Sequence, residues 1–382
     1  GASNLPVLVW IHGGAYTNGS GSIPWYHGSA LASRGAVVVS INYRLGAFGF
    51  LGEGNYGTLD MISALRWVNR NIAAYGGAVN NVTIFGESAG GSAVVSLMSS
   101  PESKGLFHKV WAMSPSIGQL RTLPRAQELQ TQFLELAEVS SLDEVRAMPL
   151  DNMLAVQAKQ MALPAANFDF YTPTAGGEAL PIDILSAAAQ SPLPLVLGSN
   201  RDEDRLWSAF DPVQAEFGQS DWERVSGEVF GDRASDARAV YEKLRPTETP
   251  KQLISSVRTD TAFRQRAQRL AEQHANHSNP TWMYWFTWAT PAFGGILGSC
   301  HALDVPFAFE NLSAPGTDML TGDGVERAGI AQRFADEIVE FAKASKPTWP
   351  AFDLGNRQTL EINAEMNVLT DPEGEIRSLF VN

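Results

Sequence analysis

The stretch from residue 82 to residue 98, VTIFGESAGGSAVVSLM, constrains the fold more than any other part of the chain. It opens with β-branched and aromatic residues, a composition typical of a buried strand. G-E-S-A-G follows, and a run of small and apolar residues then predicts a helix up to Met98. A strand that passes into a helix through G-x-S-x-G is the signature of a nucleophile elbow. We therefore expect Ser88 at the apex of a sharp turn, with its hydroxyl exposed above a sheet.

A five-residue pattern with three fixed positions can also arise by chance. No other serine of this chain lies in G-x-S-x-G, and this one stands between a predicted strand and a predicted helix. Because the structural context accompanies the motif, we interpret Ser88 as a candidate nucleophile.

A second motif follows the strand predicted at residues 5–11, which runs directly into His12-Gly13-Gly14-Ala15-Tyr16. In hydrolases with a nucleophile elbow, a loop of this H-G-G type donates backbone N–H groups to the oxyanion of the reaction. Taken alone, His-Gly-Gly could be an ordinary tight turn. Its combination with the elbow favours an oxyanion loop.

Strands and helices alternate along the chain. Further strands are predicted at residues 36–43, 109–113, 192–197 and 281–288, the last strong strand, with helices at 58–74 and 330–345. Two helical excursions leave this pattern, at about 121–165 and 205–278. Alternation of this kind predicts an α/β fold, with a mostly parallel sheet between helices and the chemistry at the carboxyl ends of the strands. We expect residues 1–382 to form a single domain.

Composition excludes several classes of protein. An apolar content of 44% argues against disorder, and no apolar run of about 18 residues exists to span a membrane. A formal net charge of −13 argues against nucleic acid as a partner. Cys300 is the single cysteine, which excludes an internal disulfide and a cysteine-built metal site. Low cysteine use favours a cytoplasmic location.

One glycine pattern invites a different reading. Gly52, Gly54 and Gly57 match G-x-G-x-x-G ahead of a helix, as in dinucleotide-binding proteins. Such a site needs an acidic residue about 20 positions further on to hold the ribose, and residues 71–81 contain none. We interpret these glycines as loop geometry.

The base and the acid are sought in the chain order serine, acid, histidine. Among the six histidines, only His301 follows both a strand and the candidate acids; the others precede the elbow or lie at the wrong edge of the sheet (His12, His27, His108, His274 and His277). The strand at 192–197 is followed by three candidate acids, Asp202, Glu203 and Asp204. The residues alone do not choose among these three.

The chain resembles the type-B carboxylesterases, the family of cholinesterases and bacterial para-nitrobenzyl esterases. The matching stretches cover nearly the whole chain and include WIHGGAY, INYRLGAFGFL, NVTIFGESAGG, LGSNRDED and CHALDVPFAF. The resemblance implies an α/β-hydrolase fold and a serine esterase that forms an acyl-enzyme from a small-molecule ester, without metal or organic cofactor. It implies a triad of Ser88, Glu203 and His301, and an oxyanion hole of the amides of Gly14, Ala15 and Ala89.

The beginning of the chain departs from the family pattern. Two or three early strands of the family are absent, so the chain is expected to be truncated at its N-terminus, and a targeting segment, if the protein has one, is expected in the missing part. In the family's strand order those strands would cover the strand at 36–43. We therefore expect that strand to be an exposed edge, a hazard for aggregation.

Several other readings stay open. The same fold also serves non-catalytic, cholinesterase-like interaction modules that have lost the serine or histidine; both residues are present here, which favours an enzyme. Glu87 either senses a cationic leaving group or supports the site electrostatically. Cys300 is read as a small buried residue rather than a redox switch. Aromatic residues are candidates for an acyl or alcohol pocket or for the core: Tyr16, Phe48, Trp207 and Phe293.

Overall fold

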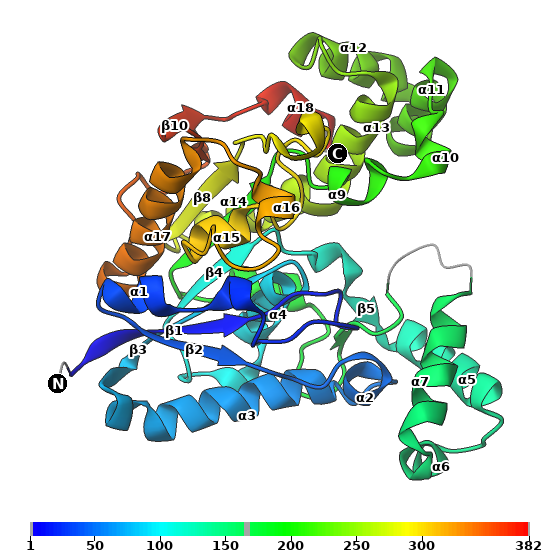
Figure 1. The fold of residues 1–382 in the computed structure, drawn as a ribbon. Helices are drawn as coiled ribbons and strands as arrows, with labels where there is room; N and C mark the ends of the chain where they lie inside the picture. Colours follow the sequence, from blue (N-terminus) through cyan, green and yellow to red (C-terminus); the bar gives the residue numbers. More distant parts are fainter. Residues whose placement is uncertain (1–2, 164–168, 381–382) are drawn as a thin grey trace.

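An eight-stranded sheet forms the centre of the molecule (Figure 1). The computed structural model describes residues 3–163 and 169–380. The strand order is β10-β9-β8-β7-β4-β3-β1-β2, and every pair is parallel except β9–β10. The strands are β1 (Leu5–Ile11), β2 (Val37–Ile41), β3 (Gly77–Glu87), β4 (Lys109–Met113), β7 (Leu195–Asn200), β8 (Thr281–Phe286), β9 (Gln358–Ile362) and β10 (Asn367–Thr370). The predicted mostly parallel sheet is confirmed.

Helices cover both faces of this sheet, because successive side chains of its central strands point to opposite sides. In β1, Val7 and Val9 belong to one buried apolar cluster, while Leu8 and Trp10 belong to another. The first cluster includes residues of α3 (Tyr56–Asn71), α4 (Ala89–Ser99) and α14 (Gln265–Asn276). The second includes residues of α1 (Ser29–Ser33), α15 (Asp304–Ala308) and α17 (Arg327–Ala344). Burial on both faces explains the continuous apolar runs of the central strands.

Two groups of helices extend beyond the sheet (Figure 1). The first contains α5 (Leu123–Ala137), α6 (Leu142–Ala147) and α7 (Leu150–Met161). The second contains α9 (Arg205–Ser208), α10 (Pro212–Ala215), α11 (Gln219–Phe230), α12 (Ala234–Leu244) and α13 (Pro250–Thr259), followed by a π-helical turn (Asp260–Arg264) and α14. The second group has an apolar cluster of its own, around Trp222, Tyr241 and Ile254.

The helical excursion predicted at about 121–165 contains three separate helices, preceded by the short strand β5 (Arg121–Thr122). Ser141 and Glu144 form a capping box that starts α6, and Pro149 precedes α7. These start signals divide the segment into three helices. Residues 164 and 165, the end of that predicted excursion, lie outside the described residues.

The sheet also continues past the strand predicted to be the last. After α17 the chain adds β9 beside β8 and then the antiparallel β10. Both are short and β10 is mostly exposed, so neither carries the apolar run that reveals the central strands.

At the other end of the sheet, β2 pairs with β1 alone among the described strands, and Val37 to Val39 are half-buried. The expectation of an edge strand here is confirmed. Along the described residues, no helix is both long and apolar enough to cross a bilayer.

Candidate active site

The nucleophile elbow is present at the end of β3. Ser88 lies between β3 and α4 with φ 59° and ψ −119°, a conformation that costs free energy for a residue with a side chain and is typical of active sites. Close packing fixes the turn: a Cβ atom at Gly90 would lie 2.0 Å from the carbonyl oxygen of Ile11. The Ser88 hydroxyl is partly exposed and makes no hydrogen bond to any other described residue. It is therefore free to meet a substrate.

His301 and Glu203 form a close pair at the carboxyl ends of β7 and β8. Nδ1 of His301 lies 2.6 Å from Oε2 of Glu203. The other oxygen of this buried carboxylate accepts hydrogen bonds from Oγ of Ser114 at 2.6 Å and from the backbone N–H of Asn200 at 2.7 Å. These contacts fix the orientation of the Glu203 carboxylate and of the imidazole ring.

The second nitrogen of His301 faces another carboxylate. Nε2 lies 3.0 Å from Oε1 of Glu87, the residue that precedes the elbow serine. Burial alone would lower the pKa of His301, but the charges of Glu87 and Glu203 outweigh it and raise this pKa well above its usual value. The two carboxylates on either side of the ring therefore stabilise the protonated form of the imidazole relative to the neutral form.

Two aromatic rings hold the imidazole from the side of the second helical group. The rings of Trp207 and Phe263 are nearly parallel, at 5° with centroids 6.3 Å apart. Each lies 4.9 Å from the centroid of the His301 ring. Both residues also line the pocket that contains Ser88. The ring of His301 is thus positioned by the wall of the pocket as well as by Glu203.

Ser88 opens into a pocket of about 640 Å³ with mainly apolar walls, the size of a typical small-molecule site. Most of its lining comes from the second helical group and the turn that follows it. The lining residues are Ala15, Ser88, Ser116, Gln119, Asp204, Trp207, Asp211, Gln214, Val229, Val257, Arg258, Thr261, Ala262 and Phe263.

The three predicted oxyanion donors lie around the elbow. Gly14 and Ala15 occupy the loop after β1 with φ 104° and 52°, and Ala15 shares the pocket with Ser88. Ala89 is the first residue of α4, where backbone N–H groups have no partner within the helix. Among the described residues, none of these three N–H groups makes a hydrogen bond to a protein acceptor. All three are free to bind an oxygen.

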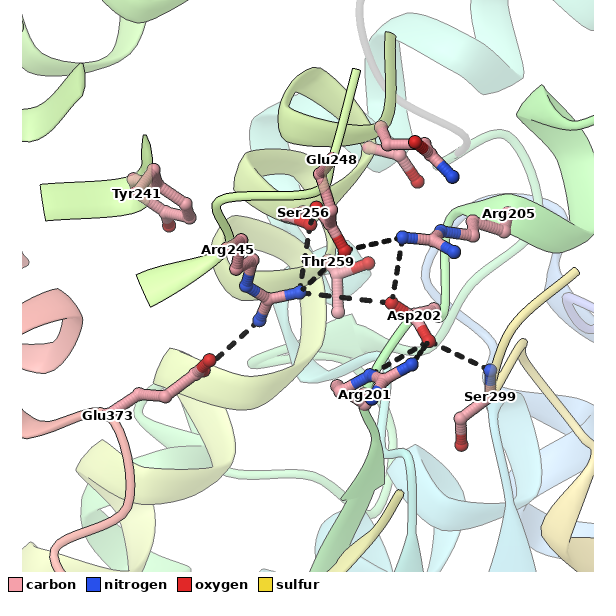
Figure 2. A network of polar contacts seen from close by, with 12 residues as sticks. Arg201, Asp202, Arg205, Tyr241, Arg245, Glu248, Ser256, Thr259, Ser299 and Glu373 are labelled. Atoms are coloured by element: carbon pink, nitrogen blue, oxygen red, sulfur yellow. Dashed lines mark hydrogen bonds and ion pairs between the residues drawn. The ribbon is translucent and has the colours of Figure 1, made fainter. Parts of the chain in front are cut away.

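The three adjacent acids have different surroundings, so the structure distinguishes residues that the sequence left equivalent. Glu203 contacts His301. Asp202 is buried within a network of arginines (Figure 2). Asp204 lines the pocket, and burial raises the pKa of its carboxyl group above the usual value.

The other histidines and Cys300 do not belong to the pair of His301 and Glu203. His274 binds Thr281 and the carbonyl of Ser191, and His12 stacks on Tyr43. Cys300 is fully buried, and burial raises the pKa of its thiol, in keeping with a small packed residue.

The four aromatic residues considered for the pocket or the core lie in different places. Trp207 lines the pocket, whereas Tyr16 is fully buried against Phe50. Phe48 lines a different pocket, and Phe293 is 55% exposed and packs on Phe210.

Sequence reasoning missed Ser114 and Phe263. Ser114 follows β4 directly, a position at the reactive edge of a parallel sheet that could have identified it. Phe263 lies in the π-helical turn after α13, and no local pattern relates it to His301.

A strained serine between strand and helix, a histidine–glutamate pair in contact with the residue before that serine, and free backbone donors define an α/β-hydrolase of the serine esterase type. Residues 1–376 match the sequence profile of the carboxylesterase family, and the chain belongs to this family. Its reaction is the hydrolysis of carboxylic esters, and the predicted α/β-hydrolase fold is confirmed.

The individual proteins that this chain resembles are also esterases. The para-nitrobenzyl esterase of Bacillus subtilis is 34% identical, with 98% of this chain and 79% of the relative aligned. The fumonisin B1 esterase of Sphingopyxis macrogoltabida is 32% identical, with 92% and 68% aligned. The crystal structure of the Geobacillus stearothermophilus carboxylesterase EST55 superposes with a TM-score of 0.87 at 33% identity, covering 100% of this chain and 83% of that one.

Proposed function

We propose that Ser88 is the nucleophile, His301 the general base and Glu203 the residue that orients the base, in hydrolysis through an acyl-enzyme. The observation that carries this assignment is the 2.6 Å contact between His301 and Glu203, close to the elbow serine and its pocket. In this arrangement Glu203 selects the imidazole tautomer with the proton on Nδ1 and stabilises the cation that forms.

The first half-reaction forms the ester of Ser88. Nε2 of His301, once neutral and released from Glu87, takes the proton of the serine hydroxyl as Oγ attacks the substrate carbonyl. The N–H groups of Gly14, Ala15 and Ala89 bind the oxyanion, and each donor of this kind contributes on the order of 10²–10³ in rate. Nε2 then gives its proton to the leaving alcohol as the bond between carbonyl carbon and alcohol oxygen breaks.

The second half-reaction returns the free enzyme. A water molecule attacks the acyl carbon and gives one proton to Nε2, and the new tetrahedral intermediate uses the same oxyanion donors. Collapse of this intermediate breaks the bond to Ser88 Oγ, which regains its proton from His301. The proposed cycle uses no metal and no organic cofactor.

Glu87 acts in this proposal on the charge of His301 rather than on the substrate. Its contact with Nε2 supports that role, because a carboxylate at 3.0 Å favours the imidazolium that both half-reactions produce. Because the Glu87 carboxylate lies against Nε2 in the structure, it has to leave Nε2 before the proton of Ser88 can be transferred there.

The substrates that we propose are neutral esters of small, largely apolar acids and alcohols. The mainly apolar pocket lining and the likeness to a para-nitrobenzyl esterase support this class. We further propose that residues 1–382 act as one α/β domain, which the continuous eight-stranded sheet supports. A cytoplasmic location is proposed from the single cysteine.

Hydrolysis of para-nitrophenyl butyrate by the wild type and by Ser88→Ala tests the assignment. We expect the variant to lose about 10⁴-fold or more in kcat. Ser96→Ala is the matched control, because Ser96 is a buried serine two turns further along α4 that bonds the carbonyl of Ser92, and its activity should stay within about twofold.

Two results would contradict the proposal. A Ser88→Ala variant with undiminished turnover would exclude Ser88 as the nucleophile. A wild-type chain that is folded by circular dichroism but hydrolyses none of a panel of aryl and benzyl esters would favour the interaction module.

A further inference from the structure

The loop that carries Glu203 lies directly against the loop that carries His301. The backbone N–H of Asp202 donates to the carbonyl of Ser299 at 2.9 Å, and that of His301 donates to the carbonyl of Glu203 at 3.2 Å. The side-chain amide of Asn200 adds a bond to the carbonyl of Cys300 at 2.7 Å. The relative position of these two loops therefore sets the distance between the two side chains of the pair.

The carboxylate of Asp202 is a further connection between the loops, and the mechanism above does not use it. Its Oδ2 accepts the backbone N–H of Ser299 at 2.8 Å and two N–H groups of Arg201 at 3.0 and 2.9 Å (Figure 2). Its Oδ1 lies 3.3 Å from Arg205 and 3.8 Å from Arg245. Burial alone would raise the pKa of this carboxyl group, but the arginines lower it. Asp202 is thus a fully buried anion with partners on both loops.

Packing leaves little freedom for this carboxylate. Gly298 precedes Ser299 with φ +58°, and a Cβ atom there would lie 2.4 Å from Oδ2 of Asp202. The approach of the histidine loop to the carboxylate therefore depends on a residue without a side chain.

The arginines that hold Asp202 are themselves anchored in the second helical group and in the C-terminal segment. Arg205 pairs with Glu248 at 2.6 Å, and Arg245, at the end of α12, pairs with Glu373 at 3.1 Å. Figure 2 shows Asp202 where these pairs meet the two loops. A displacement of the Glu203 loop would separate buried opposite charges, which resists the displacement.

We propose that Asp202 is a positioning residue that locks the loop of Glu203 to the loop of His301 and so keeps the imidazole aligned for proton transfer. This proposal rests on the hydrolytic roles proposed above. A shift of about 1 Å in a catalytic group can cost about 10² in rate even when the chemistry itself is intact. The charge of Asp202 acts on turnover through the geometry of its neighbours, and it contacts no part of the substrate.

Asp202→Asn is the direct test, because it keeps the shape of the side chain and removes its charge. We expect kcat for para-nitrophenyl butyrate to fall by about 10- to 100-fold while KM changes less than about twofold. We also expect the low-field proton resonance of the His301–Glu203 hydrogen bond, measured by NMR at low temperature, to broaden or move upfield.

Glu373→Gln is the matched control. Glu373 is a carboxylate of the same network that pairs with Arg245 and Arg264, and it contacts neither loop. If the network only stabilises the fold, Asp202→Asn and Glu373→Gln should lower kcat equally when they lower thermal stability equally. Positioning by Asp202 predicts that Glu373→Gln lowers the midpoint of thermal unfolding but lowers kcat by less than about twofold, because Glu373 acts on Asp202 only through Arg245, which lies 3.8 Å from Oδ1 of Asp202.

Arg201→Gln keeps the test decisive if Asp202→Asn does not fold. The Arg201 side chain is 34% exposed, so its replacement is tolerated, and it removes two of the donors to Oδ2. We expect a loss of about 3- to 10-fold in kcat with unchanged KM.

Four results would overturn this proposal or its basis. Positioning by Asp202 is contradicted if Asp202→Asn or Arg201→Gln leaves kcat unchanged. It is also contradicted if Glu373→Gln loses as much kcat as Asp202→Asn. If Ser88→Ala retains activity, the hydrolytic assignment itself fails, whatever the variants of Asp202 show.

Discussion

Replacement of Glu87 by glutamine should move the pH dependence of the enzyme in a defined direction. In the proposed mechanism His301 acts as a base only when its imidazole is neutral, so kcat/KM should rise with pH as the ring loses its proton. Glu87 raises the pKa of that ring in the folded protein. Glu87→Gln removes the negative charge at nearly constant shape, and we expect the acidic limb of the kcat/KM profile to move to lower pH.

The size of the shift follows from the geometry. An opposite charge within about 4–6 Å moves a pKa by about 1–3 units, and Oε1 of Glu87 lies 3.0 Å from Nε2 in a buried site. The charge of Glu87 is the largest of the contributions that raise the pKa of His301, so we expect a shift of the acidic limb to lower pH that a profile sampled at half-unit steps resolves. At a pH below the wild-type limb, the variant should be the faster enzyme.

The assay is the hydrolysis of para-nitrophenyl butyrate from pH 5 to pH 10, with the release of para-nitrophenol followed at its isosbestic wavelength. Asp304 requires a separate control, because burial and the charges of Glu87 and Glu203 raise the pKa of its carboxyl group to about 8. Asp304→Asn should retain the limb if His301 causes it. Glu102→Gln, at an exposed carboxylate paired with Arg66, should leave the profile unchanged.

A limb that stays in place in Glu87→Gln would refute this reasoning. It would mean that the contact between Glu87 and Nε2 does not persist in solution, or that a different group limits the reaction at low pH. A shift toward higher pH would contradict the sign of the electrostatic argument itself.

Two further predictions concern residues around this site and beneath it. Trp207→Ala removes a half-exposed ring whose centroid lies 4.9 Å from that of the imidazole. We expect kcat/KM to fall about tenfold, while the free energy of unfolding measured with urea changes by less than about 1 kcal/mol. An unchanged kcat/KM would contradict the positioning of His301 by Trp207. His274 has a folded-state pKa of about 4 against 6.5 for the unfolded chain, because burial disfavours its charge. The stabilisation of the fold by neutral His274 is therefore fully present above pH 6.5, and about 3 kcal/mol of the free energy of unfolding is lost as the pH falls toward 4. The free energy of urea unfolding of His274→Gln should lack this dependence on pH. An equal pH dependence in the variant would refute the assignment to His274.

Much of the fold could be read from local sequence, and the reason is burial. Strand β1 and strand β4 lie between helices, so apart from Lys109 at the start of β4 their residues are apolar, and both strands have the predicted bounds. Ser88 could be singled out because the elbow needs a particular backbone turn and small neighbours at fixed spacing. Short edge strands such as β10 lack this signature because solvent covers one side of them.

The surroundings of the candidate site were less accessible to sequence reasoning. The choice of Glu203 over its neighbours depends on the path of the loop after β7, which contacts with Ser299 and with the arginines determine. Phe263 approaches His301 only through the packing of the second helical group. Such relations join residues far apart in the chain, and one sequence carries no local record of them.

The origin of the pocket wall affects how the substrate range of this enzyme can change. Most of the wall comes from the second helical group and the turn after it, which pack around their own apolar cluster, whereas the sheet carries Ser88. Natural variation or directed recombination could therefore exchange this group and create new ester preferences without rebuilding the sheet. The aromatic pair Trp207 and Phe263 restricts that freedom, since any replacement wall must also supply surfaces that support the imidazole. Selection for a new substrate and selection for turnover consequently act on the same helices.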